Sequence, residues 1–157
     1  MKLSATILCN NILKRAFDEK IPINPMKLQR LLYYVCRNYT KQVGYSPVNE
    51  SFEVWRCGPV LVSVQNQFED FGSKPIKKYA RDAMGTAYVV DESKIPILAS
   101  ILDIVWGKYK MMSAMELARI AYGDGSGWYR AFQEWRKHIT EEDMKCDETG
   151  WKGGKYD

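Results

Sequence analysis

Residues 24–39 read NPMKLQRLLYYVCRNY, a run that contains both a helix start and an apolar helical stripe. Asn24 can cap the helix with its side chain, and Pro25 fits the first helical position. Apolar residues then recur at steps of three and four: Leu28, Leu31, Leu32, Val35, Cys36 and Tyr39. The polar residues fall on other faces: Lys27, Arg30, Arg37 and Asn38. The spacing predicts a core helix with one buried face, ending near Gly44.

The rest of the chain predicts a mainly α domain with a small antiparallel β element. Similar apolar spacing and caps predict further helices over about residues 3–19, 59–72, 93–110, 113–122, 128–138 and 140–143. Residues 52–55 alternate like a short strand, and residues 73–92 have the composition of a hairpin with a turn at 84–86. We therefore expect one compact domain over residues 1–146 and a loose tail over 147–157.

Composition predicts a reduced, cytoplasmic protein that needs no cofactor. At 157 residues and 46% apolar content the chain can bury a core of its own. Its four cysteines form no Cys-x-x-Cys pair, and His138 is the sole histidine, so no metal site is expected. The start of the chain lacks the apolar core of a signal peptide, and the sequence has no apolar run long enough to span a membrane. We therefore expect neither export nor a membrane span.

No residue pattern predicts a catalytic centre. A Cys-His nucleophile would need His138 beside one of the cysteines, and only Cys57 falls in an irregular segment. The glycine-rich residues 123–127 are followed by Trp128 and not by the lysine of a phosphate-binding loop, which indicates a turn between helices. We expect no catalytic residue, and an interaction protein fits better than an enzyme.

The net charge of +4 leaves a nucleic-acid partner as an open alternative, because the acidic residues gather near the C-terminal end and make the main body more basic. Candidate phosphate contacts are Lys74, Lys77, Lys78, Arg81, Arg130, Arg136 and Lys137. A recognisable recognition helix is not present, so a protein partner is preferred.

Three segments together carry a family resemblance: KLQRLLYY at 27–34, WRCGPV at 55–60, and the Ser113–Leu117 stretch leading to Trp128. In this respect the chain resembles the SocA-like or Panacea antitoxin-domain family. The chain departs from the family pattern next to these motifs, at Cys57, Val62, Gln65 and Gly127.

The resemblance implies an antitoxin that neutralises a cognate protein toxin, encoded by an adjacent gene, through direct binding. It also implies one alternative, an adaptor that delivers the toxin to a cytosolic protease, and it assigns no catalytic residue. Large aromatic and arginine side chains dominate protein interfaces. We therefore expect the partner to contact Tyr33, Trp55, Arg56, Gln65 and Tyr129, and Trp135 is a further aromatic candidate.

Overall fold

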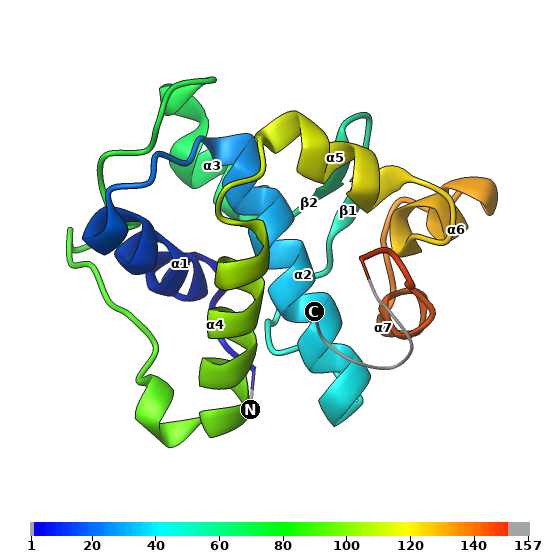
Figure 1. Ribbon diagram of the computed structural model, residues 1–157, viewed down its shortest axis with the longest axis horizontal. Helices are drawn as coiled ribbons and strands as arrows, with labels where there is room; N and C mark the ends of the chain where they lie inside the picture. Colours follow the sequence, from blue (N-terminus) through cyan, green and yellow to red (C-terminus); the bar gives the residue numbers. More distant parts are fainter. Residues whose placement is uncertain (1, 151–157) are drawn as a thin grey trace.

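Helix α2 (Pro25–Val43) runs through the centre of the molecule, and the other elements surround it (Figure 1). The computed structural model describes residues 2–150. Within that range seven α-helices and one two-stranded antiparallel sheet confirm the predicted fold class. The ends of α2 are also as predicted: Asn24 accepts a hydrogen bond from the Lys27 amide at 2.8 Å, and Gly44 caps the other end with a φ of 101°.

The apolar stripe of α2 lies in the core between α1 (Ala5–Glu19) and α4 (Pro96–Tyr109). Leu31 on α2 and Leu102 on α4 are both fully buried members of one apolar cluster. The ring of Tyr34 stacks on the ring of Tyr109, with centroids 4.9 Å apart. These contacts join the two helices that the sequence pattern marks most clearly.

The polar side chains of α2 are buried too, which corrects the expectation that only one face of this helix is buried. Six of them expose less than a tenth of their surface: Lys27, Gln29, Arg30, Arg37, Asn38 and Thr40. Gln29 donates to the carbonyl of Leu61 at 2.9 Å and accepts from its amide at 3.0 Å. Arg30 donates to the carbonyls of Cys57, at 2.6 Å, and Pro59. Neighbouring backbone groups thus bind most of these buried polar atoms, and only Arg30 Nε has no hydrogen-bond partner among the described residues.

The segment after α2 forms a hairpin of β1 (Glu53–Trp55) and β2 (Gly58–Val60), with Trp55 opposite Gly58. The predicted strand at 52–55 is confirmed, but the prediction that Pro59 opens a helix is wrong. Helix α3 (Val62–Phe68) begins later and continues as the 3-10 helix η1 (Glu69–Phe71). The helix starts late because Arg30 and Gln29 bind the backbone of residues 57–61 and hold it extended.

The hairpin predicted over residues 73–92 is absent; within the described part of the chain, only residues 53–55 and 58–60 form a sheet. Two asparagines of α1 take the place of a partner strand. Asn10 binds the amide and carbonyl of Ala80 and also the carbonyl of Tyr88, while Asn11 binds the amide and carbonyl of Val90. The turn near residue 85 does form, and the 3-10 helix η2 (Glu92–Lys94) leads into α4.

The C-terminal third contains α5 (Ala114–Tyr122), α6 (Gly127–Gln133) and α7 (Glu141–Lys145). The predicted caps by Ser113 and Thr140 are both present as capping boxes. Helix α6 ends at Gln133, earlier than predicted, in a tight turn described below.

The prediction of a loose tail that starts at residue 147 also needs correction. Asp147 is fully buried, where it accepts hydrogen bonds from the Tyr33 hydroxyl at 2.5 Å, the Arg37 guanidinium at 3.0 Å and the Gly127 amide at 2.9 Å. Residues 147–150 are therefore part of the domain. Residues 151–157 of the predicted tail lie outside the described residues.

Candidate partner-binding surface

Trp128 joins the β hairpin to α6 and is the anchor of the candidate surface. Its indole nitrogen donates to the carbonyl of Trp55 at 2.7 Å. Its ring stacks on Phe132, with centroids 5.0 Å apart and planes within 8° of parallel. Trp128 is largely buried, whereas 52% of Phe132 is exposed, so the aromatic stack extends from the core to the surface.

Trp135 sits in an unusual backbone conformation directly after α6. Its φ is +58°, in the left-handed region that glycine occupies at most helix ends of this kind. Two hydrogen bonds hold the turn, from the Trp135 amide to the Phe132 carbonyl at 3.1 Å and from the Arg136 amide to the Ala131 carbonyl at 3.0 Å. The side chain is 95% exposed, so the core gains almost nothing from the indole.

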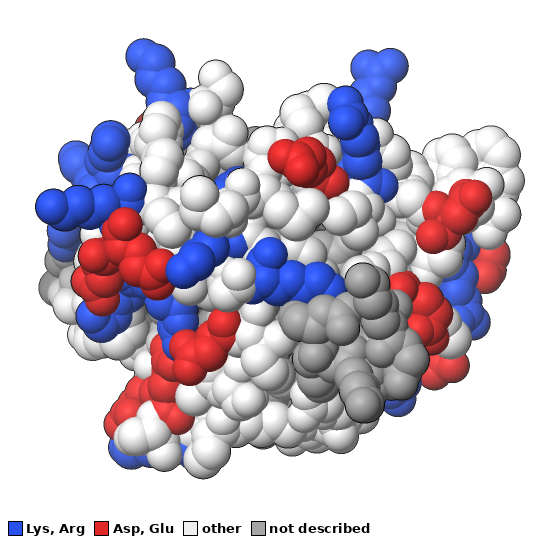
Figure 2. All heavy atoms as spheres, viewed as in Figure 1, with Lys and Arg blue, Asp and Glu red and all other residues white. Residues whose placement is uncertain are grey.

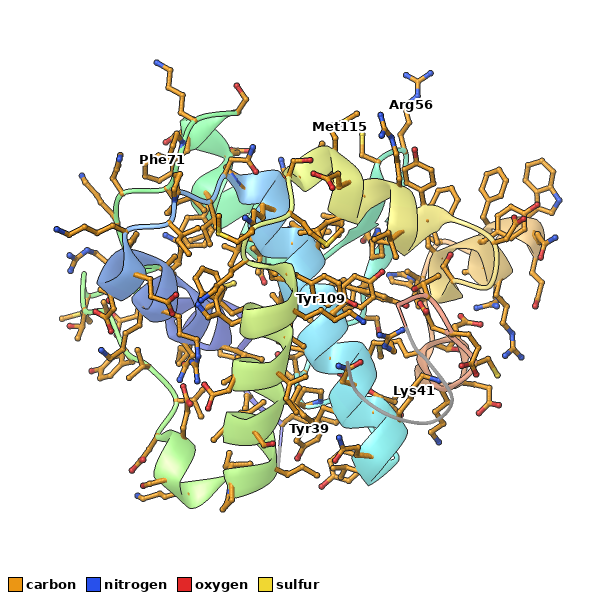
Figure 3. The ribbon with its side chains drawn as sticks, in the orientation of Figure 1. Tyr39, Lys41, Arg56, Phe71, Tyr109 and Met115 are labelled. Carbon is orange, nitrogen blue, oxygen red and sulfur yellow. The ribbon has the colours of Figure 1, made fainter. Side chains whose placement is uncertain are left out.

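Five exposed side chains lie on the hairpin tip, α5 and the end of α6: Trp55, Arg56, Met115, Phe132 and Trp135. We call these residues the hairpin-α6 face. Helix α5 packs against β2 and α6 packs against β1, which places the three elements side by side. Arg56 and Met115 project on the same side of the molecule, away from its body (Figure 3). The face combines large apolar groups with a guanidinium, the composition typical of binding hot spots.

The arginines beside this face are already engaged by one carboxylate. Asp143 accepts two hydrogen bonds from Arg136, at 2.6 and 2.8 Å, and forms an ion pair with Arg130 at 3.3 Å. Burial alone would raise the pKa of the Asp143 carboxyl, but the hydrogen bonds from Arg136 and Thr140 hold that pKa below its ordinary value. Two of the seven candidate phosphate contacts therefore serve to fix α7 beside α6.

The structure brings together three of the five predicted partner-binding residues. Trp55 and Arg56 belong to the hairpin-α6 face, and Tyr129 lies half-buried beside it, with its ring centroid 6.3 Å from that of Phe132. Gln65 lies elsewhere, on α3, which packs against α1 and α2.

The prediction that Tyr33 contacts a partner needs correction, because Tyr33 is fully buried and its hydroxyl donates to Asp147. It cannot offer an exposed ring to a partner in this structure. Sequence reasoning missed Met115 and Phe132; the spacing of Trp128, Phe132 and Trp135 along one helix face is the signal that could have found Phe132.

The cysteines divide into two pairs by burial. Cys9 and Cys36 are fully buried, and burial raises the pKa of both thiols, whereas Cys57 and Cys146 are exposed. Residues 2–150 contain no cluster of three or more His, Cys, Asp or Glu side chains arranged to hold a metal. Over the same residues, no helix combines the length and the apolar character needed to span a membrane.

Comparison with known proteins identifies the family of this chain. The family model described as "Antitoxin SocA-like, Panacea domain" matches residues 28–129, which is more than half of the chain. The protein named antitoxin SocA of Caulobacter vibrioides is 29% identical over 129 residues, covering 80% of this chain and 69% of the relative. No solved structure matches the chain. The matched range contains the signature segment of α2, the hairpin and the anchor Trp128, and the chain therefore belongs to the SocA-like, Panacea-domain antitoxin family.

Proposed function

We propose that this protein is an antitoxin that neutralises a cognate protein toxin by binding it directly, and that the hairpin-α6 face makes the contact. Membership of the SocA-like family supports the inhibitory role. The composition and exposure of the face support a protein partner. The toxin is expected to be the product of a neighbouring gene.

The observation that carries this proposal is Trp135. A bulky residue in the left-handed region is strained by about 1–2 kcal/mol, and an indole that is 95% exposed contributes little burial in return. Folding alone would be better served by glycine at this position. A tryptophan that costs stability and projects into solvent three residues after the exposed Phe132 is well suited to enter a pocket on a partner.

The decisive experiment replaces Trp135 by glycine and measures folding and binding separately. For Trp135→Gly we expect a free energy of unfolding higher by about 0.5–1 kcal/mol, because the strain is relieved. We also expect a complex with the toxin that is weaker by about 2 kcal/mol, a typical loss for a central aromatic contact. Urea denaturation gives the first quantity, and titration calorimetry with the purified toxin gives the second.

The matched control is Met84→Ala, because Met84 is 88% exposed and lies in the turn at residues 82–86, distant from the face in the chain. It should change neither stability nor binding appreciably. In cells that express the toxin, growth should be restored by the parent protein and by Met84→Ala, but less well by Trp135→Gly. Toxin abundance, followed by immunoblot, should stay constant during rescue; a fall that depends on a protease would favour the adaptor mechanism. Undiminished binding by Trp135→Gly would contradict the proposed contact.

A further inference from the structure

An open groove lies at the opposite end of the molecule, between the C-terminal end of α1 and the loop that follows η1. Its volume is about 450 Å³, and its apolar lining includes Phe17, Ile21, Pro75 and Ile76. The Ile76 amide donates to the Ile23 carbonyl at 2.8 Å, so the two extended segments lie side by side and form a continuous wall. Part of the wall is buried and fixed, because Ile76 is only 3% exposed.

Lysines surround this groove. Lys20 and Lys77 line it directly, and Lys74 and Lys78 flank it in the chain. All four are exposed, and none forms an ion pair with any residue in the range 2–150. Figure 2 shows the concentration of Lys and Arg side chains at the upper left of the molecule, over these same segments.

The acidic residues at the end of α1 do not neutralise the lysines, because they are already paired. Asp18 forms an ion pair with Lys14 at 2.9 Å, and Glu19 forms one with Lys110 at 2.8 Å. Glu69 and Asp70 lie on η1 and do not line the groove. The groove is therefore an apolar channel with a positively charged rim.

We propose that this groove binds an acidic linear segment of a partner protein that carries aliphatic or aromatic anchor residues. Carboxylates of such a segment would meet the lysine rim, while its apolar side chains would fill the groove. Charge complementarity of this kind favours encounter and selects the partner, and apolar anchors in a pocket supply the affinity. The site is separate from the hairpin-α6 face, so the proposal does not depend on the toxin contact described above.

A second observation supports a binding role at Lys20. Among the described residues only Lys20 and Trp135 combine a side chain with a positive φ, and Lys20 has a φ of 56° at the end of α1. As with Trp135, glycine would suit this backbone better. Lys20 is the C-cap residue of α1, and its side chain lines the groove.

Nucleic acid fits this groove less well than a protein segment does. Phosphate contacts would use the lysines, but an apolar wall formed by Ile21 and Pro75 offers nothing to a sugar-phosphate backbone. Binding that depends on the lysines alone would have a steep salt dependence and no requirement for apolar groups. The two kinds of partner can therefore be separated by experiment.

The test uses the full-length protein and a fluorescein-labelled peptide with the core Glu-Glu-Leu-Phe-Glu-Glu, followed by fluorescence anisotropy. We expect saturable binding that weakens at least about tenfold when the Leu and Phe of the peptide become Ser, or when the protein carries Lys20→Glu with Lys77→Glu. The matched control is Lys145→Glu, a charge reversal on exposed α7, which should leave affinity unchanged. In parallel, amide shifts in NMR spectra should map binding to Phe17, Ile21 and Ile76.

Other outcomes would overturn the proposal. Failure of the parent protein to bind the peptide, equal binding of the serine peptide, or shifts that map away from the groove would each do so. Duplex DNA that displaces the peptide with a steep salt dependence would assign the lysines to nucleic acid instead. Because Trp135→Gly leaves the groove intact, that variant should bind the peptide normally even if it no longer binds the toxin.

Discussion

Arg30 and Gly58 lie so close together that a side chain on residue 58 would press against the guanidinium. A Cβ atom built on Gly58 would stand 3.0 Å from the guanidinium carbon of Arg30. The same guanidinium donates to the carbonyls on both sides of Gly58, those of Cys57 and Pro59. Burial lowers the pKa of Arg30 to about 10, which still leaves the group charged at neutral pH. The turn of the hairpin is thus wrapped around a buried positive charge on α2.

Gly58→Ala should destabilise the protein by about 2–4 kcal/mol, because it adds a displaced, buried guanidinium to the strain of a φ of 121°. Gly44→Ala is the matched control: its φ is 101°, but a Cβ there would meet no atom within 4 Å. It should cost only the backbone strain, about 1 kcal/mol. Urea denaturation of both variants checks this, and equal losses would show that the contact with Arg30 is unimportant.

Asp147→Ala should cost about 3–5 kcal/mol, because it leaves the buried Arg37 guanidinium without its carboxylate. Tyr33→Phe should cost less, about 1–2 kcal/mol, since Asp147 keeps its bonds to Arg37 and the Gly127 amide. Denaturation midpoints test both values. If Asp147→Ala unfolded like the parent, residues 147–150 would not contribute to the stability of the domain.

Stability should fall on acidification partly through Asp143. Its pKa is lowered in the folded state despite burial, by hydrogen bonds from Arg136 and Thr140, so the carboxylate stabilises the fold above its unfolded pKa. That contribution is lost as pH falls through the lowered pKa. Asp143→Asn should therefore be less stable than the parent at pH 7, by about 1–3 kcal/mol, and the difference should shrink towards acidic pH. A difference that stayed constant with pH would argue against this ion pair.

Cys57→Ser should leave toxin binding and growth rescue unchanged, although Cys57 is exposed on the hairpin next to Arg56. A direct-binding mechanism needs surface complementarity and no thiol chemistry. Cys146→Ser, at the other exposed cysteine, is the control. A Cys57→Ser protein that bound the toxin but no longer rescued growth would call for an enzymatic mechanism.

Sequence patterns located three helix starts, those of α2, α5 and α7, because side-chain caps are local. Asn24, Ser113 and Thr140 each bind an amide within their own helix, so spacing along the chain is sufficient to identify them. The partner of a long-range polar side chain has no such signature. Arg30 and Gln29 look like solvent-facing residues of an amphipathic helix until the backbone they bind is known.

The same reason explains the missing hairpin at 73–92. The composition of residues 87–90 favours a strand, but Tyr88 and Val90 bind the side chain amides of Asn10 and Asn11, which lie 78 and 79 residues earlier in the chain and replace a partner strand. In the candidate site, Trp55 and Arg56 were predicted as contact residues from residue type and family motif, and both side chains are exposed. The sequence does not show which aromatic side chains are exposed: Tyr33 is fully buried, whereas Trp135 is 95% exposed.

The buried polar groups of α2 bind main-chain atoms, which all amino acids share except proline, whose nitrogen carries no hydrogen. Gln29 binds the amide and carbonyl of residue 61, and Arg30 binds the carbonyls of residues 57 and 59, so these bonds do not use the exposed side chains of the hairpin. Outward-facing residues of the hairpin can consequently be exchanged without loosening its attachment, with Gly58 as the exception. The fold thus separates the residues that hold the hairpin from those that are exposed on it, so exposed positions such as Trp55 and Arg56 can change while the hairpin stays attached to α2.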